Sequence, residues 1–460
     1  MVATEQPKPG HPTNKMGKIA FAALSASSIE NYDFFIYGTA AALVFPRIFF
    51  PNQSSLTGAM LSFATFAVGF VARPAGGILF GHIGDVYGRR RALIGALVGM
   101  GLATTLIGLL PPHQVIGIAA PLLLVLLRFL QGIALGGQQG GVVLLALENA
   151  PPRRRGFYSS FAQAGGPAGI ILGNLAFIAV IRSTAPEAFE SWGWRVPFLA
   201  SAVLIALAIR LQFTLEETAA FQTLRKAKQE QPARDMKSSP ALRVFRGNFR
   251  RIVIIAGAYI GINVTYYLFM TFAVSYSTSV VGISRDTALL AVLVAAAVQL
   301  VMLPVSGAVS DRVGRRVMLL AGSGALAVWS FAFWPLLNTG STPLIMIAFI
   351  VGLGLLHTVM YGPQGAFFAE AFSTGLRYSG FSLGLQLGSV LGGGLAPLIA
   401  TSLFAATGTS FSITAYMALV CAITFGAVLL MPETHTKDID VPEEQHEQEA
   451  VNDHAHPKIG

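Results

Sequence analysis

The sequence predicts an all-α integral membrane protein whose twelve transmembrane helices form two pseudo-symmetric six-helix bundles. Composition is the first reason: of 460 residues, 53% are hydrophobic and only 12% are charged, with a mean hydropathy of +0.62. Soluble domains carry about 25% charged residues. The second reason is a succession of apolar runs, each long enough for the roughly 20 residues that a membrane span needs. The third reason is an internal repeat.

The repeat is carried by a polar island, Gly81–Arg91, which lies between two apolar runs. An Asp followed at +4 and +5 by Arg occurs there and again near residue 311, and a Glu seven residues before an Arg follows each copy. Both signals are displaced by roughly 220 residues, which indicates a duplication. Two homologous membrane halves are typical of a secondary transporter. The repeated residues are Asp85, Arg89, Arg90, Glu148 and Arg155, and then Asp311, Arg315, Arg316, Glu370 and Arg377.

Twelve apolar runs follow one another along the chain and define the expected domains. We expect an N-terminal tail over 1–17, a six-helix bundle over 18–215, a linker over 216–250, a second bundle over 251–431 and a C-terminal tail over 432–460. The expected spans are 18–45, 56–80, 92–111, 115–147, 157–182, 194–215, 251–279, 286–309, 317–338, 342–369, 378–406 and 409–431.

The distribution of positive charge predicts the orientation. About 19 of the 31 Lys and Arg residues fall in alternate loops and in the linker, which is the asymmetry of cytoplasmic segments. Both termini are therefore expected in the cytoplasm of a cell that carries this protein in its plasma membrane. The same asymmetry explains the net charge of +9 without a nucleic-acid partner.

Cofactor and metal sites are not expected. The single Cys421 lies in an apolar run and allows neither a disulfide nor a thiolate site within the chain. The acidic tail holds several histidines without a fixed ligand spacing. No nucleophile–base constellation indicates an enzyme. Trp192 and Trp194 are expected as anchors at the membrane interface.

Glycines at four-residue spacing predict closely packed helices, because small residues let helix backbones approach. They are Gly132, Gly136 and Gly140, then Gly165, Gly169 and Gly173, and then Gly384, Gly388 and Gly392.

Five stretches in order give a resemblance to a known family. The island reads Gly-x-x-Gly-Asp-x-x-Gly-Arg-Arg and resembles the signature loop of the major facilitator superfamily. Residues 30–38, 128–132, 192–198 and 370–380 resemble its metabolite–proton symporter branch, closest to shikimate-type, 2-oxoglutarate-type and proline/betaine-type carriers. The resemblance covers about residues 18–431 and implies alternating access between two bundles, with the proton as the coupling ion and a monomer as the working unit.

Ionisable residues inside predicted spans are candidates for function, because each costs about 2.5–3.5 kcal/mol on insertion scales. Glu30 and Asp33 share one face of the first span, and either is a candidate proton carrier or a structural partner of an arginine. His357 is a third proton-coupling candidate, with a neutral hydrogen-bonded histidine as the alternative. Arg128 is expected near mid-bilayer, where it pairs with Asp33 or receives an anionic substrate.

Further residues are candidates for the substrate cavity. Arg73 is either a gate residue or a substrate contact. Gln138 stands where the resembled branch usually has Glu, so coupling rests on other groups or is weaker. The neutral polar candidates, each also able to serve as a contact between helices, are Tyr37, Asn174, Tyr266 and Gln364.

The repeated Asp and Arg residues are interpreted as a cytoplasmic gate. Asp85 is expected to accept backbone N–H groups at a helix end and to pair with arginine. Glu148 with Arg155, and Glu370 with Arg377, are expected to be matching pairs.

The function expected from these observations is proton-coupled symport of a small organic acid, shikimate-like or a di- or keto-carboxylate. The alternatives are a proton-coupled carrier of an osmolyte such as proline or betaine, and an uncoupled facilitator or exporter of a small metabolite.

Overall fold

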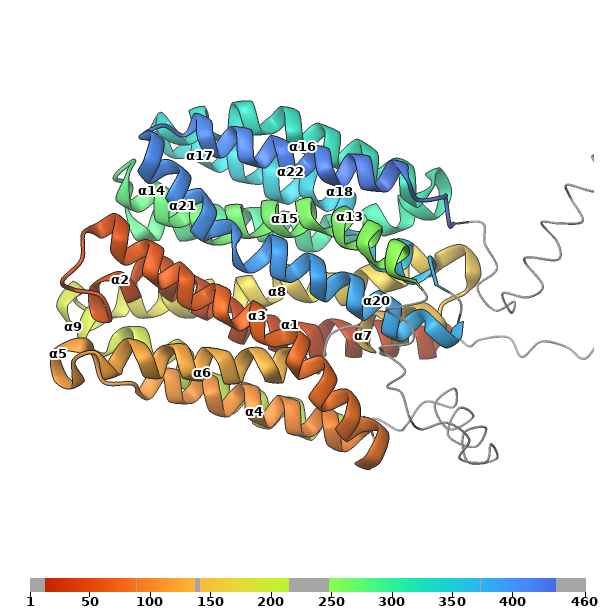
Figure 1. Cartoon of the computed structure of the whole chain (residues 1–460), viewed down its shortest axis with the longest axis horizontal. Helices are drawn as coiled ribbons and strands as arrows, with labels where there is room; N and C mark the ends of the chain where they lie inside the picture. Colours follow the sequence, from red (N-terminus) through yellow and green to blue (C-terminus); the bar gives the residue numbers. More distant parts are fainter. Residues whose placement is uncertain (1–12, 88, 137–140, 215–247, 373, 436–460) are drawn as a thin grey trace, which may run out of the picture.

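Two helical bundles make up the molecule in a computed structural model. The structure describes residues 13–87, 89–136, 141–214, 248–372 and 374–435, and these contain helices and no strand. In Figure 1 the N-terminal bundle, coloured red to yellow, lies below the C-terminal bundle, coloured green to blue. The predicted linker falls almost wholly outside the described residues.

Six long helices or helix pairs form the N-terminal bundle, and short helices connect them. The long elements are α1 Thr13–Leu43, α3 Ser55–Tyr87, α4 Arg89–Leu109, α6 Ala119–Gly136 followed by α7 Gly141–Glu148, α8 Arg155–Ser183 and α10 Val196–Thr214. The short ones are α2 Phe45–Ile48, α5 His113–Ile116, η1 Pro152–Arg154, α9 Pro186–Ser191 and η2 Gly193–Arg195.

The C-terminal bundle repeats this plan, but π-helical turns interrupt three of its spans. Its elements are α13 Phe249–Tyr267, η3 Leu268–Phe272 and α14 Ala273–Ser279; α15 Arg285–Val313; α16 Arg315–Asn338; α17 Thr342–Phe349, η4 Ile350–His357, α18 Thr358–Tyr361 and α19 Gln364–Ala369; α20 Thr374–Ser389, η5 Val390–Gly394 and α21 Ala396–Thr407; and α22 Phe411–Leu429. Such π-turns occur often at functional sites.

The predicted twelve spans agree with this arrangement. Nine segments among the described residues are long and apolar enough to cross a membrane, and two shorter apolar helices cover Ile94–Leu109 and Gly193–Ala206. The twelfth is α1, a 31-residue helix that holds Glu30 and Asp33. Helix α1 begins at Thr13 rather than near Lys18.

The polar island differs from its predicted form. It was expected to be a short loop, but α3 continues to Tyr87 and α4 begins at Arg89, so most of it is helical. In the second copy the turn is Gly314 alone, with a φ of +106°, a conformation that favours glycine. We call this end of the molecule, on the right in Figure 1, the signature end, and the end with α2, α5 and α9 the opposite end.

Close helix packing at glycines is confirmed for the described members of the predicted series. A Cβ at Gly132 would overlap the backbone of Gly69 on α3, and one at Gly165 would overlap Ser27 on α1. A Cβ at Gly388 would lie 2.9 Å from the carbonyl oxygen of Ala256 on α13. These contacts join helices within each bundle. Gly156 on α8 and Gly307 on α15 make a similar contact between the bundles.

Trp194 does not anchor the protein at a membrane surface. Its side chain is fully buried, with ring centroids 5.8–6.1 Å from those of Phe45, Phe49 and Phe198. Trp192, in contrast, is 52% exposed, as an interface anchor requires.

Gly76→Ala is expected to destabilise the protein, because the added Cβ would overlap the carbonyl oxygen of Ile133 where α3 packs on α6. The clash should outweigh the helix propensity of about 1 kcal/mol that alanine gains over glycine. A thermal unfolding midpoint lower by at least about 5 °C in detergent would show this. Gly426→Ala in α22 is the matched control, since nothing lies within 4 Å of its Cβ position; equal midpoints for the two variants would contradict the packing role.

Candidate functional site

A cavity lies where the two bundles meet, and both bundles line it. Its walls come from α1, α3, α7 and α8 on one side and from α13, α18, α19 and α20 on the other. The polar lining residues are Ser27, Glu30, Asn31, Arg73, Gln163, Tyr259, Asn263, Tyr266, Tyr267, Tyr361 and Gln364.

Arg73 is the one cation and Glu30 the one carboxyl group among the described lining residues. The guanidinium of Arg73 lies 4.3 Å from the ring centroid of Phe70 and 4.7 Å from that of Phe34. Its Nε has no hydrogen-bond partner although the side chain is only 4% exposed. Glu30 is half-buried. The cavity therefore offers one positive and one potentially negative group to a ligand.

The tyrosines of the cavity pack against one another and against His357. The Tyr266 ring centroid lies 5.1 Å from that of His357 and 5.4 Å from that of Tyr361, and the His357 and Tyr361 centroids are 5.2 Å apart, so the three rings form one cluster. The Tyr266 hydroxyl is buried without a partner. A Cβ at Gly166 on α8 would lie 2.9 Å and 3.0 Å from the hydroxyls of Tyr266 and Tyr361. Glycine at this position leaves room for both hydroxyls.

Two amides complete the polar wall in the C-terminal bundle. Asn263 donates to the Ser389 hydroxyl over 3.1 Å, and Gln364 keeps its Oε1 without a partner. Gln364 and Tyr266 thus line the cavity. Each has a polar side-chain atom without a hydrogen-bond partner, which a ligand could bind.

Asp33 lies away from this lining, inside the N-terminal bundle. Its side chain is fully buried, and neither carboxyl oxygen has a hydrogen-bond partner. The hydroxyls of Ser201 on α10 and Thr104 on α4 are next to it. An ionised carboxylate without donor or counter-ion would be costly in such a place. The surroundings therefore fit the neutral, protonated acid.

Arg128 is fully buried and is not paired with Asp33. Its guanidinium lies 4.1 Å from the ring centroid of Tyr37 and 4.6 Å from that of Phe34. Its Nη1 donates to Gln131 Oε1 over 2.6 Å, while Nε and Nη2 have no partner. The direct ion pair, one of the two expected arrangements, is not formed in this conformation.

His357 has both ring nitrogens engaged. Its Nε2 lies 3.0 Å from the carbonyl oxygen of Ile262 and its Nδ1 lies 3.0 Å from Gln299 Nε2. A neutral ring with the proton on Nε2 satisfies both contacts. This is the arrangement that we gave as the alternative to a proton-coupling role.

Three predicted cavity residues are not in the described lining. The Tyr37 hydroxyl donates to Thr65, and Thr39 donates to Asn174, so both side chains join neighbouring helices. Gln138 falls outside the described residues. Sequence reasoning missed Gln131, although it follows Arg128 by three positions and so shares its helix face. It also missed Asn31, Gln163, Tyr259 and Tyr361, which nothing in their local sequence distinguishes from other polar residues of a span.

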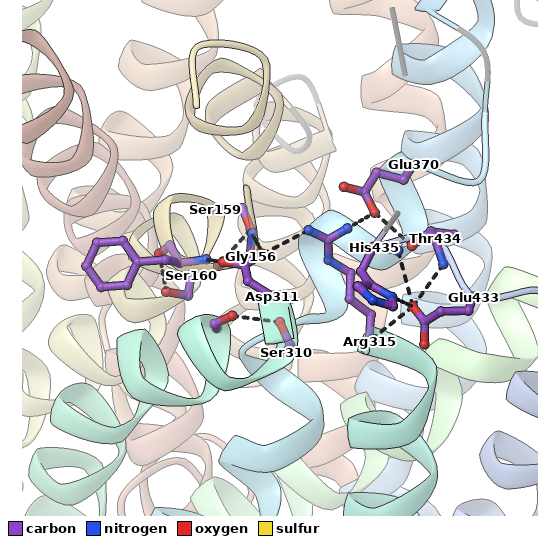
Figure 2. A network of polar contacts seen from close by, with 12 residues as sticks. Gly156, Ser159, Ser160, Ser310, Asp311, Arg315, Glu370, Glu433, Thr434 and His435 are labelled. Atoms are coloured by element: carbon purple, nitrogen blue, oxygen red, sulfur yellow. Dashed lines mark hydrogen bonds and ion pairs between the residues drawn. The ribbon is translucent and has the colours of Figure 1, made fainter. Parts of the chain in front are cut away.

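At the signature end, the second copy of the repeat joins the two bundles. Asp311 Oδ1 accepts from the backbone N–H of Gly156 over 2.8 Å, and its Oδ2 accepts from that of Phe157 over 2.9 Å. These N–H groups belong to the first turn of α8, where a helix favours negative charge. Arg315 holds Asp311 at 3.0 Å and also pairs with Glu370 (Figure 2). We call this group the latch.

The partners in the latch differ from the predicted ones. Glu370 pairs with Arg315, and Glu148 lies 3.6 Å from Arg377 across the bundle interface. Glu370 therefore pairs within its own copy of the repeat and Glu148 pairs across the two copies, where Glu148 with Arg155 and Glu370 with Arg377 had been expected. Arg155 is buried at the start of α8. Arg316 donates to the Leu429 carbonyl. The side chains of Asp85, Arg89 and Arg90 are outside the described part of the chain.

The first residues of the predicted C-terminal tail are part of the latch. Glu433 accepts from the backbone N–H groups of Arg315 and Arg316, each over 3.0 Å, at the start of α16. Burial alone would raise the pKa of the Glu433 carboxyl, but four backbone N–H donors hold it below its ordinary value. The Thr434 hydroxyl donates to Glu370 over 2.7 Å (Figure 2).

The opposite end also carries ion pairs between the bundles. Glu190 on α9 accepts from Arg47 over 2.6 Å and from Arg285 of the C-terminal bundle over 3.1 Å. Arg182 at the end of α8 and Asp286 at the start of α15 are 2.8 Å apart. The cavity is therefore bounded at both ends by contacts that cross the interface.

The comparisons with known proteins decide the family. The protein family described as "Sugar (and other) transporter" matches residues 19–445. The chain belongs to this family of the major facilitator superfamily. It is 38% identical to the Escherichia coli inner membrane metabolite transport protein YhjE over 93% of this chain and 97% of that protein. It is 36% identical to the E. coli shikimate transporter, with 91% and 94% covered.

More distant comparisons agree with the family. The E. coli proline/betaine transporter is 31% identical, with 92% of this chain and 85% of that protein covered. A solved structure of the proton:xylose symporter XylE aligns with a TM-score of 0.71 at 19% identity, covering 95% and 99%, and this likeness shows the fold alone.

The predicted family, fold class and transporter function are confirmed by these comparisons. The protein is a multi-pass membrane transporter of metabolites in the major facilitator superfamily, and it is not an enzyme.

Asp311→Asn and Asp286→Asn are expected to shift the conformational equilibrium in opposite directions, each toward opening of a different end of the cavity. The first weakens the latch and so favours opening of the signature end with closure of the opposite end. The second removes a contact between the bundles at the opposite end. Spin labels at Ser191 and Thr339, both exposed at that end, should therefore come closer in Asp311→Asn and move apart in Asp286→Asn, measured in a Cys421→Ser background. Distance distributions that change in the same direction would contradict the two-gate arrangement.

Proposed function

We propose that this protein imports a small organic acid together with a proton, by alternating access of a central cavity. The single observation that carries the proposal is the cavity between the bundles, with Arg73 as a buried cation that has an unpaired donor. Asp33 and Arg128, which are buried inside the N-terminal bundle without an ion pair to each other, are the proposed proton-coupling groups. The coupling ion is the proton, and no bound cofactor takes part.

The orientation follows from the charge distribution. The signature end carries the arginine-rich turns and is proposed to face the cytoplasm, together with both termini. The relatives include an inner membrane protein, which supports a bacterial plasma membrane. Each chain contains a complete cavity, which supports a monomer as the working unit.

The charges of the cavity favour a monocarboxylate. Arg73 presents a planar guanidinium, whose geometry matches a carboxylate. A dicarboxylate such as 2-oxoglutarate would need a second cation, and the described lining has none. The hydroxyl of Tyr266 and the amide of Gln364 are suited to hydroxyl groups on the substrate. A shikimate-like acid is therefore the first candidate substrate, in agreement with the shikimate transporter among the relatives.

Proton coupling follows from the state of Asp33. Its surroundings fit the protonated acid, so it can take up a proton in one conformation and release it in another. A monoanion carried with one proton is electroneutral, so the membrane potential, about 2.3 kcal/mol per charge per 100 mV, does not drive it. The pH gradient would drive accumulation.

A zwitterionic osmolyte is the second candidate, because Glu30 and Arg73 place opposite charges on one cavity and a proline/betaine transporter is among the relatives. Quaternary ammonium groups are usually recognised by the faces of aromatic rings. The Tyr266 ring already packs against Phe35, Tyr267, His357 and Tyr361 and is 5% exposed, which disfavours this candidate. An uncoupled facilitator or exporter is a further alternative. It would account for a glutamine, which cannot carry a proton, at position 138, where the resembled branch usually has Glu.

Uptake of radiolabelled shikimate into proteoliposomes with an inward proton gradient tests the proposal. We expect accumulation above equilibrium that disappears without the gradient. Asp33→Asn should abolish accumulation but retain counterflow, because the cavity is unchanged.

The other outcomes separate the alternatives. Equilibration without accumulation would identify a facilitator. Transport of glycine betaine in preference to shikimate would support the osmolyte carrier. An absence of flux for shikimate and for 2-oxoglutarate would reject the organic-acid assignment.

Arg73→Lys is expected to raise the KM for the acid about 10-fold, because lysine keeps the charge but loses the guanidinium geometry. Arg73→Gln should raise it about 100-fold, in line with the loss of a charged hydrogen bond. Arg250→Gln is the control, since Arg250 is exposed at the start of α13. Unchanged KM values in both Arg73 variants would place the carboxylate elsewhere.

A further inference from the structure

Gln131 stands between the buried cation and the buried acid of the N-terminal bundle. Its Oε1 accepts from Arg128 Nη1 over 2.6 Å, and its Nε2 donates to Thr104 Oγ1 over 2.8 Å. Thr104 in turn is next to Asp33. A row of polar groups therefore leads from α6 through α4 toward α1, and its hydrogen bonds run from Arg128 through Gln131 to Thr104. All of its members are 0% exposed.

The residues at the two ends of this row, Arg128 and Asp33, have polar atoms without hydrogen-bond partners. Arg128 keeps Nε and Nη2 without partners, and Asp33 keeps both oxygens without partners. Buried polar groups are normally satisfied, so unpaired atoms on both members of an opposite-charge pair call for an explanation. Movement of Arg128 toward an ionised Asp33 would satisfy both groups. In the present structure the amide of Gln131 holds Arg128 instead.

Arg128 has little freedom except along this row. A Cβ at Gly69 would lie 2.5 Å from its Nε, so α3 closes one side of the guanidinium. The rings of Phe34, Tyr37 and Phe66 lie within 4.8 Å and close the others. Within this packing, the amide oxygen of Gln131 is the described hydrogen-bond acceptor of the Arg128 guanidinium.

We propose that Gln131 is a positioning residue for proton coupling, which keeps Arg128 away from Asp33 while Asp33 is protonated and releases it when the proton leaves. This inference rests on the proposed proton symport and assigns a role to a residue within it. The titratable or charged groups around the row are Glu30, Tyr32 and Tyr37 on α1, Arg73 on α3, Arg128 on α6 and Tyr267 on α13.

Two substitutions of Gln131 should shift the pH dependence in opposite directions. Gln131→Leu removes both hydrogen bonds and frees Arg128 to pair with ionised Asp33, so the midpoint of the pH profile should move about one unit lower. Gln131→Glu occupies Arg128 with a fixed acid and adds negative charge near Asp33, so the midpoint should move higher. Structural damage alone would not produce opposite shifts.

The experiment measures two pH profiles for each purified variant. One is shikimate uptake into proteoliposomes, and the other is the thermal unfolding midpoint without substrate. Tyr276→Phe is the control, because it removes a hydrogen bond from a tyrosine to Asn338 within the C-terminal bundle and should shift neither profile. Asp33→Asn should abolish the part of both profiles that the Gln131 variants shift.

The two readouts separate this inference from the proposed function. Opposite shifts in the unfolding profile support the role of Gln131 even if the wild-type protein takes up no shikimate, in which case only the substrate assignment fails. Coincident profiles for Gln131→Leu, Gln131→Glu and the wild-type protein would overturn the inference.

Discussion

Contact between helix backbones at glycine is the constraint on which the rest of the structure depends. Side chains in a bilayer gain little from leaving lipid, so helices associate through close packing. Gly69 on α3 shows what this packing allows. Its backbone lies against Gly132 of α6, and its missing side chain leaves room for the Arg128 guanidinium. The same close approach that holds α3 to α6 therefore allows a cation to be buried between them.

Each end of the cavity is closed by charge, but with different geometry. At the signature end, Asp311 binds backbone N–H groups of a helix terminus, and its position depends on Arg315. At the opposite end, the ion pairs join exposed side chains, such as Arg182, which is 64% exposed. Exposed pairs contribute little stability. We therefore regard the latch as the stronger of the two closures.

Much of the fold was predictable from the sequence, because apolar runs and a repeated motif report directly on membrane spans. The cavity was only partly predictable. Arg73, Glu30, Tyr266 and Gln364 were found because a polar residue in a span is conspicuous, but the same signal selected Asn174, which only joins helices. Distinguishing the two cases needs helix rotation and depth, which periodicity in a uniformly apolar span does not supply. The ion pairs at the signature end were mispredicted because sequence spacing does not show that Glu370 meets Arg315 or that Glu148 meets Arg377 of the other copy.

The docking of Glu433 and Thr434 on the latch has a consequence for how the protein is made. These residues follow α22, so a ribosome has translated all of the described helices before it reaches them. The network around Arg315 cannot be completed until Glu433 and Thr434 have been added, whatever the state of the helices already inserted. A chain that ends early would hold both bundles but lack the cap on α16 and the hydroxyl bound to Glu370. Closure at the signature end thus depends on the synthesis of the segment that follows α22.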